Sequence, residues 1–388
     1  SHASGGVSLL GGQLPPSLHL DKGPILGELE KLRAAGDFSV PAFEGVVNSL
    51  REQVASLMWQ LVVTHAELPK HLQALKDYFL MEKGNFYQVF LTEARPLMQV
   101  VPPQALRGKP SPEAEMAALF SQAAQRTGCD EDPHFANLAL FMRDPQDWDS
   151  LSLRYRASWP LGLILTPAVL GKYQQMFRFL WRLRRVRAEL DHAHLNLSAR
   201  GGSGSGGRNA GAGGVEVPPQ VWHLRQQMLH LVCNLQIYVH VDVLETQQRI
   251  LRDKITGAEN FLDCSEYLNT FLDTMIMQSF LDIASISSML DGIVQLITKY
   301  TASVEEAQRE MAAMTGDGDG DGQYPPASLS LFARLQEDFQ RRCTMLFTVL
   351  KSTKLSVKAR APHLHQFLLR LNFNHYMSNQ ALASAALI

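Results

Sequence analysis

The chain has 388 residues, of which 46% are hydrophobic, enough to bury a substantial core in two domains or one elongated helical array. Its 36 lysines and arginines nearly balance 38 aspartates and glutamates, and the formal net charge of -2 argues against a general nucleic-acid-binding protein. The four cysteines form no CxxC pair, so neither a disulfide framework nor a zinc site is indicated, and a reducing, cytoplasmic compartment is favoured.

The first twenty residues contain no charged residue other than histidine, and glycines and prolines interrupt them. No positively charged region precedes an apolar core, as a secretory signal requires, so we expect residues 1–20 to form a disordered segment. Because the chain begins with Ser1, we interpret the sequence as a piece of a longer protein. No stretch reaches the roughly 18 apolar residues of a membrane span, which predicts a soluble protein without membrane insertion.

Helical periodicity begins at about Asp21. Apolar residues at three- and four-residue steps predict two helices, separated near Pro41, that form a helical hairpin. The same period continues from Leu72 to Leu97, and short helices follow at about 112–125.

Residues 151–166 have a different pattern. Leu151, Leu153 and Tyr155 alternate with polar residues, and leucines alternate again from 161 to 165, which predicts a small β-hairpin across 151–166. Thr166 is typical of a helix N-cap followed by proline at the first helical position, where the missing N–H costs nothing. A long helix should begin there.

This long helix is amphipathic over about six turns. Its apolar stripe, predicted to face the core, consists of Val169, Tyr173, Met176, Phe177, Leu180, Leu183, Val186 and Leu190. The opposite face carries Lys172, Arg178, Arg182, Arg184, Arg185 and Arg187, opposed only by Glu189 and Asp191. Either a solvated surface or a docking site for an acidic partner accounts for this basic face. A different hypothesis is a helical scaffold that binds nucleic acid or an anionic membrane through residues 178–187, with strong salt dependence.

Two glycine-rich stretches, at 201–214 and 316–322, predict flexible loops. Long helical stretches are expected between them at about 219–255 and 259–308, and two further helices at about 328–355 and 362–376. In the second stretch Ile276, Ile283, Leu290 and Ile297 recur every seven residues, which predicts one buried seam. Helices greatly outnumber strands, so the pattern predicts an all-α bundle or array.

No motif specifies catalysis or cofactor binding. Gly202, Gly204 and Gly207 match GxGxxG but follow a helix rather than a strand. Residues 317–322 mimic the start of a calcium-binding loop, but its twelfth position is Ser328 instead of glutamate. The closely spaced histidines stand two apart and do not share a helix face. We therefore expect no enzymatic activity, no cofactor and no metal.

Four stretches resemble the gamma-tubulin complex component family. The signature-like stretch is WPLGLILTPAVLGKYQQMFRFLWRLRRVRAEL at 159–190. The others are HLQALKDYFLMEKGNFYQVFL at 71–91, NLQIYVHVDVLETQ at 234–247 and LLRLNFNHYM at 368–377. They keep their order along the chain, which chance similarity between helical proteins would not produce.

The resemblance implies stacked helical bundles in an elongated array, with gamma-tubulin and other gamma-tubulin complex components as partners and no covalent chemistry. Residues 21–66 would be the tail of a preceding helical domain that makes lateral contacts. Residues 67–380 would form the C-terminal gamma-tubulin-binding domain, with flexible loops at 198–217 and 314–327. The implied role is to scaffold gamma-tubulin for microtubule nucleation, in the cytoplasm and cytoskeleton at microtubule-organising centres and spindle poles.

The contact residues for gamma-tubulin are predicted from charge and residue type. Tubulins are acidic, and arginine and tyrosine are favoured at binding hot spots. The predicted set is Arg154, Arg156, Lys172, Arg178, His375 and Tyr376. One departure from the family is Asn372, where the LRLDFN-like motif commonly has aspartate, and we expect this change to alter a cap or a salt bridge.

Overall fold

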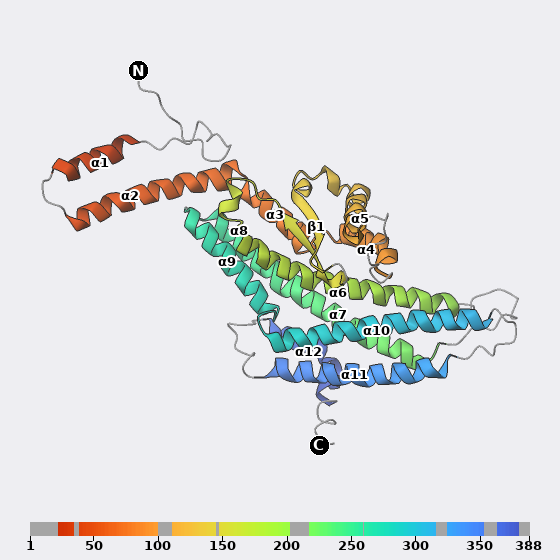
Figure 1. Ribbon diagram of the computed structural model, residues 1–388. Helices are drawn as coiled ribbons and strands as arrows, with labels where there is room; N and C mark the ends of the chain where they lie inside the picture. The colour runs from red at the N-terminus through yellow and green to blue at the C-terminus, as the bar shows by residue number, and fades with distance from the viewer. Residues whose placement is uncertain are drawn as a thin grey trace.

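The computed structural model describes residues 22–34, 39–99, 111–144, 147–201, 217–258, 260–315, 324–352 and 363–379. Within these ranges almost all regular structure is helical, and one two-stranded sheet accompanies it. Figure 1 shows an arm formed by α1 and α2 that projects from a body of layered helices. The predicted all-α fold with a small hairpin is therefore confirmed. The predicted segment 1–20 lies outside the described residues.

The arm consists of α1 (Lys22–Ala34) and α2 (Val40–Trp59), in agreement with the predicted helical hairpin. No residue of α2 is buried, and Phe43 and Val47 are exposed large hydrophobics. A π-helix, η1 (Gln60–His65), leads from α2 into the body. There follow α3 (Leu68–Phe79), α4 (Gly84–Gln99) and α5 (Pro112–Thr127).

The central helix is α6 (Pro167–Gly201), which contacts α3, α7, α9, α10 and the sheet. It begins as predicted, with Pro167 as its first residue and the Thr166 hydroxyl accepting a hydrogen bond of 3.4 Å from the Val169 N–H. All eight residues of the predicted apolar stripe are buried. Burying apolar surface on several sides holds the helix in the core.

Aromatic rings fill the core between α3, α4 and α6. The Trp181 ring lies 5.5 Å from that of Phe90 and is stacked on Phe177 at 6.4 Å, and Phe79 meets Phe177 edge-on. The Trp181 indole N–H donates to the carbonyl of Trp148 at 3.1 Å, so its polar atom is satisfied despite complete burial.

The sheet corrects the predicted hairpin. β2 (Leu151–Tyr155) is the first predicted strand, but its antiparallel partner is β1 (Leu138–Met142), which precedes it. Residues 161–163 instead form a 3-10 turn, with Leu161, Ile164 and Leu165 buried. The leucines at 161 and 165 are buried from a turn and not from a strand, although they alternate with other residues as in a strand. Two short alternating runs do not by themselves show which segments pair in a sheet.

Three short 3-10 segments lead into or between the strands: η2 (Cys129–Glu131), η3 (Phe135–Asn137) and η4 (Trp148–Ser150).

The second half of the body starts with one continuous helical segment: α7 (Pro219–Ile237), the π-helix η6 (Tyr238–Glu245) and α8 (Thr246–Thr256). The predicted helix over 259–308 is interrupted, because α9 (Phe261–Gln278) and α10 (Ala284–Thr315) are separated at Ser279–Ile283. Phe280 there has a left-handed φ of 61° and a buried side chain, so Ile283 belongs to a bend instead of one unbroken seam.

The chain closes with α11 (Pro326–Lys351), α12 (Leu364–Leu371) and the 3-10 turn η7 (Phe373–His375). α11 packs along α10, and α12 packs on α7 and α11. Residues 202–216 and 316–323 of the predicted loops lie outside the described residues.

Candidate protein-interaction surfaces

The basic face of α6 is largely neutralised within the protein. The Lys172 amine lies 2.6 Å from an Asp273 carboxylate oxygen on α9 and also donates to Asn269 at 3.3 Å. Arg182 pairs with Asp291 on α10, and Arg185 lies 2.9 Å from Asp149 before β2. These cations join α6 to its neighbours.

Arg184 and Arg187 of this face are also engaged. Arg184 donates to the carbonyls of Gly84 at 3.1 Å and Met81 at 3.2 Å, and burial lowers its pKa. Arg187 donates to Gln236 at 2.9 Å and lies near Asp191. The prediction of one free basic face is therefore wrong: α6 is surrounded by other elements, and polar groups of the protein meet all of its charges on this face except that of Arg178.

Two of the predicted contact residues lie on the outer side of the hairpin. Arg154 and Arg156 are exposed, whereas Leu153 and Tyr155 between them point into the core. The Arg154 guanidinium lies 5.0 Å from the centre of the Phe141 ring on β1, a cation–π contact. This outer face is accessible to a partner.

Arg178 is half-buried beside the hairpin, and within the described residues it makes no ion pair. Burial lowers its pKa, and the charges of Arg143 and Arg182 act in the same direction. Lys172 differs from these arginines because its charge is already met by Asp273. It serves to join α6 to α9.

His375 and Tyr376 lie elsewhere, in the turn after α12. Asn374 and His375 have left-handed φ values of 54° and 57°, which are costly for residues other than glycine. His375 is exposed, and the Tyr376 hydroxyl accepts a hydrogen bond of 2.9 Å from Gln227 on α7. Phe373 is 68% exposed, which is unusual for so large an apolar side chain.

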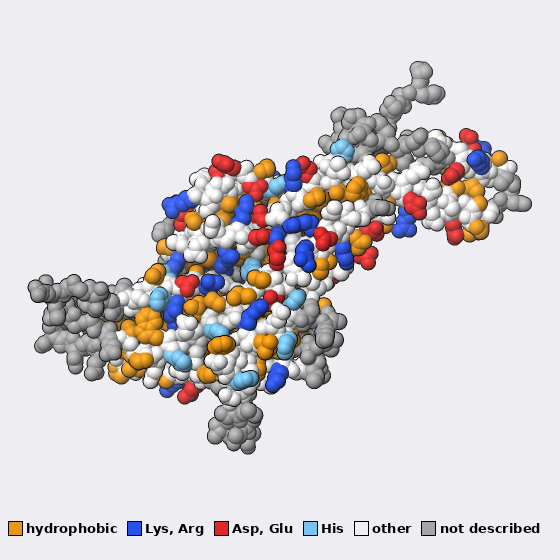
Figure 2. Space-filling model, turned by 180° about the vertical axis from the view of Figure 1, so that it is seen from behind, with side chains coloured by type: hydrophobic (Ala, Val, Ile, Leu, Met, Phe, Trp, Pro, Cys, Tyr) orange, Lys and Arg blue, Asp and Glu red, His pale blue; other side chains and the backbone are white. Residues whose placement is uncertain are grey.

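A cavity of about 270 Å³ opens beside this turn. Its lining includes His223 and His230 of α7, Phe339 and Cys343 of α11, and Phe373 and Tyr376. Figure 2 shows apolar and histidine side chains mixed over the half of the visible face that lies away from the α1–α2 arm. We call the surface formed by Leu369, Phe373, His375, Tyr376 and this cavity the α12 surface.

Two contacts fix α12 in place. The Phe367 ring is stacked on Tyr238 of η6 with a centroid separation of 4.8 Å, and Arg370 pairs with the buried Asp242 of η6. Asn372, the departure from the family motif, uses both ends of its amide on Ser378: it donates to the hydroxyl at 2.9 Å and accepts from the N–H at 3.0 Å. The amide thus acts as a cap for the turn.

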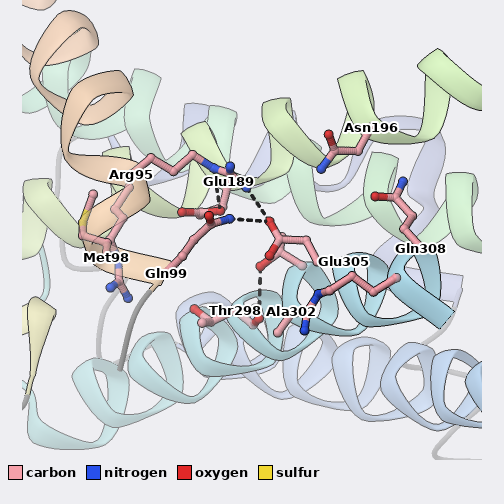
Figure 3. A pocket seen from close by; sticks show the side chains of 12 residues that line it. Arg95, Met98, Gln99, Glu189, Asn196, Thr298, Ala302, Glu305 and Gln308 are labelled. Atoms are coloured by element: carbon pink, nitrogen blue, oxygen red, sulfur yellow. Dashed lines mark hydrogen bonds and ion pairs between the residues drawn. The ribbon is translucent and has the colours of Figure 1, made fainter. Parts of the chain in front are cut away.

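A larger cavity of about 610 Å³ lies between α4, α6 and α10 (Figure 3). Charged groups of opposite sign meet across it: Arg95 contacts Glu305 and lies 3.6 Å from Glu189, and Gln99 donates to Glu305 at 3.0 Å. Burial raises the pKa of Glu189, while the Arg95 charge opposes that shift. These ion pairs and this hydrogen bond join three helices.

The structure thus separates the predicted contact residues. Arg154, Arg156 and Arg178 gather at the hairpin, whereas His375 and Tyr376 belong to the α12 surface on the other side of α6 and α7 (Figure 1). Sequence reasoning missed Leu369 and Phe373, because their apolar character in a helical pattern indicates core. Only their exposure marks them.

Comparison with known proteins identifies the family. The family model described as "Gamma tubulin complex component C-terminal" matches residues 68–377, which include the hairpin, α6 and the α12 surface. The chain belongs to this family. The resemblance of the four sequence stretches is therefore confirmed.

Individual relatives agree with this assignment. The chain is 33% identical to gamma-tubulin complex component 4 of Arabidopsis thaliana over 95% of its own length and 52% of that protein. It is 30% identical to gamma-tubulin complex component 4 of Homo sapiens, over 90% of this chain and 52% of the relative. Spindle pole body component alp6 of Schizosaccharomyces pombe is 23% identical over 86% of the chain and 41% of that protein. The chain spans about half the length of the curated relatives it matches.

Two observations bear on other classes of protein. Among the described residues, no helix combines the length and apolar character needed to cross a membrane. In the same part of the chain, no three histidine, cysteine, aspartate or glutamate side chains are grouped so that they could hold a metal ion.

Proposed function

We propose that this chain is the gamma-tubulin-binding part of a gamma-tubulin complex component and acts as a non-catalytic scaffold. Its membership of the family over residues 68–377 carries the proposal. Its relatives include gamma-tubulin complex components 2, 4 and 6 and a spindle pole body component. The corresponding places of action are microtubule-organising centres and spindle poles in the cytoplasm.

The mechanism that we propose is multivalent. Each module holds one gamma-tubulin, and association with other complex components aligns several of them. Weak contacts of incoming tubulin then become collectively strong, which favours microtubule nucleation. We assign residues 67–380 to tubulin binding. Residues 21–66 would end a preceding domain, and the alignment with the Arabidopsis relative, which covers 95% of the chain, supports this because it extends beyond 68–377.

We assign gamma-tubulin to the α12 surface. Binding energy concentrates in a few aromatic side chains next to pockets, and here Phe373 and Tyr376 stand beside an apolar cavity. Left-handed backbone at Asn374 and His375 presents Phe373 outward, and such strain is common at functional sites. His375 and Tyr376 thus remain in the proposed contact set, joined by Phe373.

Capture of purified gamma-tubulin by the immobilised chain at near-physiological salt tests this assignment. We expect the wild-type chain to retain gamma-tubulin and the double variant Phe373→Ala with Tyr376→Ala to bind at least about tenfold more weakly. Leu262→Ala with Met345→Ala is the matched control, because it also removes two exposed hydrophobic side chains, from α9 and α11. Equal capture by both double variants would show that the α12 surface is not the contact.

The alternative scaffold for nucleic acid or anionic membrane loses its main support. It requires the cations at 178–187 to face solvent, yet Arg182, Arg184 and Arg185 are engaged with neighbouring elements. Retention of DNA or anionic vesicles without gamma-tubulin would nevertheless favour that alternative over our proposal.

A further inference from the structure

We propose that Arg143, Arg154, Arg156 and Arg178, the arginine cluster around the hairpin, bind an extended, carboxylate-rich segment of a partner protein. The proposal goes beyond tubulin binding by the α12 surface. It rests on the proposed function only for the expectation that the chain assembles with other proteins.

Within the part of the chain that the structure describes, the cluster differs from the other cations near the hairpin in lacking counter-charges. Lys172, Arg182 and Arg185 each have a carboxylate within 2.9 Å. None of the four cluster arginines has an ion pair or side-chain hydrogen bond with another described residue. Among the described residues, these four arginines stand without acids beside one lysine and two arginines that have them, which indicates a surface suited to an external anion.

The strand register places three of the four on one face of the hairpin. Arg154 is opposite Ala139, the Arg156 N–H bonds to the Asn137 carbonyl at 2.8 Å, and the Arg143 N–H bonds to the Ser150 carbonyl at 3.4 Å. Side chains two residues apart on a strand share a face and stand roughly 7 Å apart. Arg154 and Arg156 therefore match the spacing of alternate carboxylates in an extended peptide.

Arg178 reaches the same region from α6. One turn before it, Gln174 donates to the Leu153 carbonyl of β2 at 3.1 Å, and three residues after it Trp181 donates to the Trp148 carbonyl. Residues at these spacings lie on one helix face, so Arg178 stands against the hairpin edge. Burial lowers the pKa of Arg178, and the nearby charges of Arg143 and Arg182 lower it further; a bound carboxylate would offset this repulsion.

An acidic peptide fits this site better than a nucleic acid or a membrane. Both strands are only five residues long. The Phe141 ring, which contacts the Arg154 guanidinium, places an apolar group among the charges of the cluster. Arginine forms two parallel bonds with a carboxylate, so a few glutamates suffice for recognition.

Fluorescence anisotropy with a labelled deca-glutamate peptide tests the proposal without any tubulin. We expect saturable binding at about 50 mM salt that weakens severalfold at about 200 mM. The variant Arg143→Glu, Arg154→Glu, Arg178→Glu should lose the binding. Its control, Arg249→Glu, Lys299→Glu, Arg334→Glu, changes net charge equally at exposed positions on α8, α10 and α11 and should keep it. Equal loss in both variants would reduce the effect to net charge and overturn the proposal.

A milder variant guards against misfolding of the triple variant. Arg154→Gln with Arg156→Gln changes only two exposed side chains, and we expect about tenfold weaker peptide binding with an unchanged melting temperature. Undiminished binding would overturn the proposal.

A thymidine 20-mer and vesicles containing phosphatidylserine serve as competing probes. If either binds more tightly than the peptide, and through the same arginines, the ligand class is wrong. Gamma-tubulin capture by these variants is measured separately, so failure of either proposal can be recognised alone.

Discussion

The Arg370 guanidinium donates two hydrogen bonds, of 2.6 and 3.1 Å, to the Asp242 carboxylate and so joins α12 to the π-helix η6. Asp242 is only 8% exposed, whereas the Arg370 side chain is about one-third exposed. The hydrogen bond to Asp242 raises the pKa of Arg370. Because α12 carries the surface proposed for gamma-tubulin, this pair also positions that surface.

We predict unequal effects of truncating the two partners. Arg370→Ala leaves a buried carboxylate without a partner and should destabilise the docking of α12 by about 2–4 kcal/mol. Asp242→Ala leaves an arginine that can reach water and should cost less, about 1–2 kcal/mol. Limited proteolysis of the C-terminal region and thermal unfolding measure both. A larger effect of Asp242→Ala would contradict the burial argument.

Substitution of the two tryptophans of the 159–190 stretch should affect stability to very different degrees. Trp181 is fully buried among aromatic rings, so Trp181→Ala should lower the free energy of unfolding by about 3–5 kcal/mol. Trp159 is 44% exposed, and Trp159→Ala should change it by less than about 0.5 kcal/mol. Urea denaturation of the two variants is the measurement, with each serving as the control for the other.

Gly292 in α10 should tolerate alanine. A Cβ there would lie 2.1 Å from Nη1 of Arg342 on α11, but this is the end of an exposed, flexible side chain that can move away. Alanine favours a helix over glycine by about 1 kcal/mol, so Gly292→Ala should leave stability unchanged or raise it by up to that amount. Gly292→Leu should destabilise the chain by crowding α11. A loss of more than about 1 kcal/mol for alanine, measured by urea denaturation, would mean that Arg342 is fixed in place.

His240 in η6 should make stability depend on pH. Burial, with a smaller effect from Arg184, lowers the pKa of His240 from 6.5 to about 4. Between about pH 4 and pH 6.5, His240 therefore binds a proton in the unfolded chain but not in the folded chain. The stabilisation is therefore complete above about pH 6.5 and is lost as the pH falls towards 4, by up to about 3 kcal/mol.

Urea denaturation at pH 5 and pH 7 tests this expectation. His240→Gln should lose less stability than the wild type between these two values, because glutamine does not titrate. The matched control is His365→Gln, an exposed histidine of α12. An identical loss in wild type and His240→Gln would show that other groups cause the pH dependence.

Local sequence patterns were sufficient for much of the fold. Thr166–Pro167 marked the start of α6, and three/four spacing identified its buried stripe, because an N-cap and a helical period depend only on residues close in the chain. The family signature was also readable from the residues at 159–190.

Pairing between distant segments was not readable in this way. Nothing near Leu151–Tyr155 specifies that residues 138–142, rather than 161–165, supply its partner strand. Likewise, the continuous apolar period through 259–308 concealed the bend at Phe280, since a buried bend keeps apolar residues too.

By itself, the sequence determined which segments become helices, which faces of them are apolar and to which family the chain belongs. Only the tertiary structure decided which charges are paired: it placed acids against Lys172, Arg182 and Arg185, whereas no acid of the described residues pairs with Arg154 or Arg178. It likewise left Phe373 exposed on the α12 surface. The physical reason is that a charge or an apolar ring acquires its role from what packs against it, and those neighbours come from distant parts of the chain.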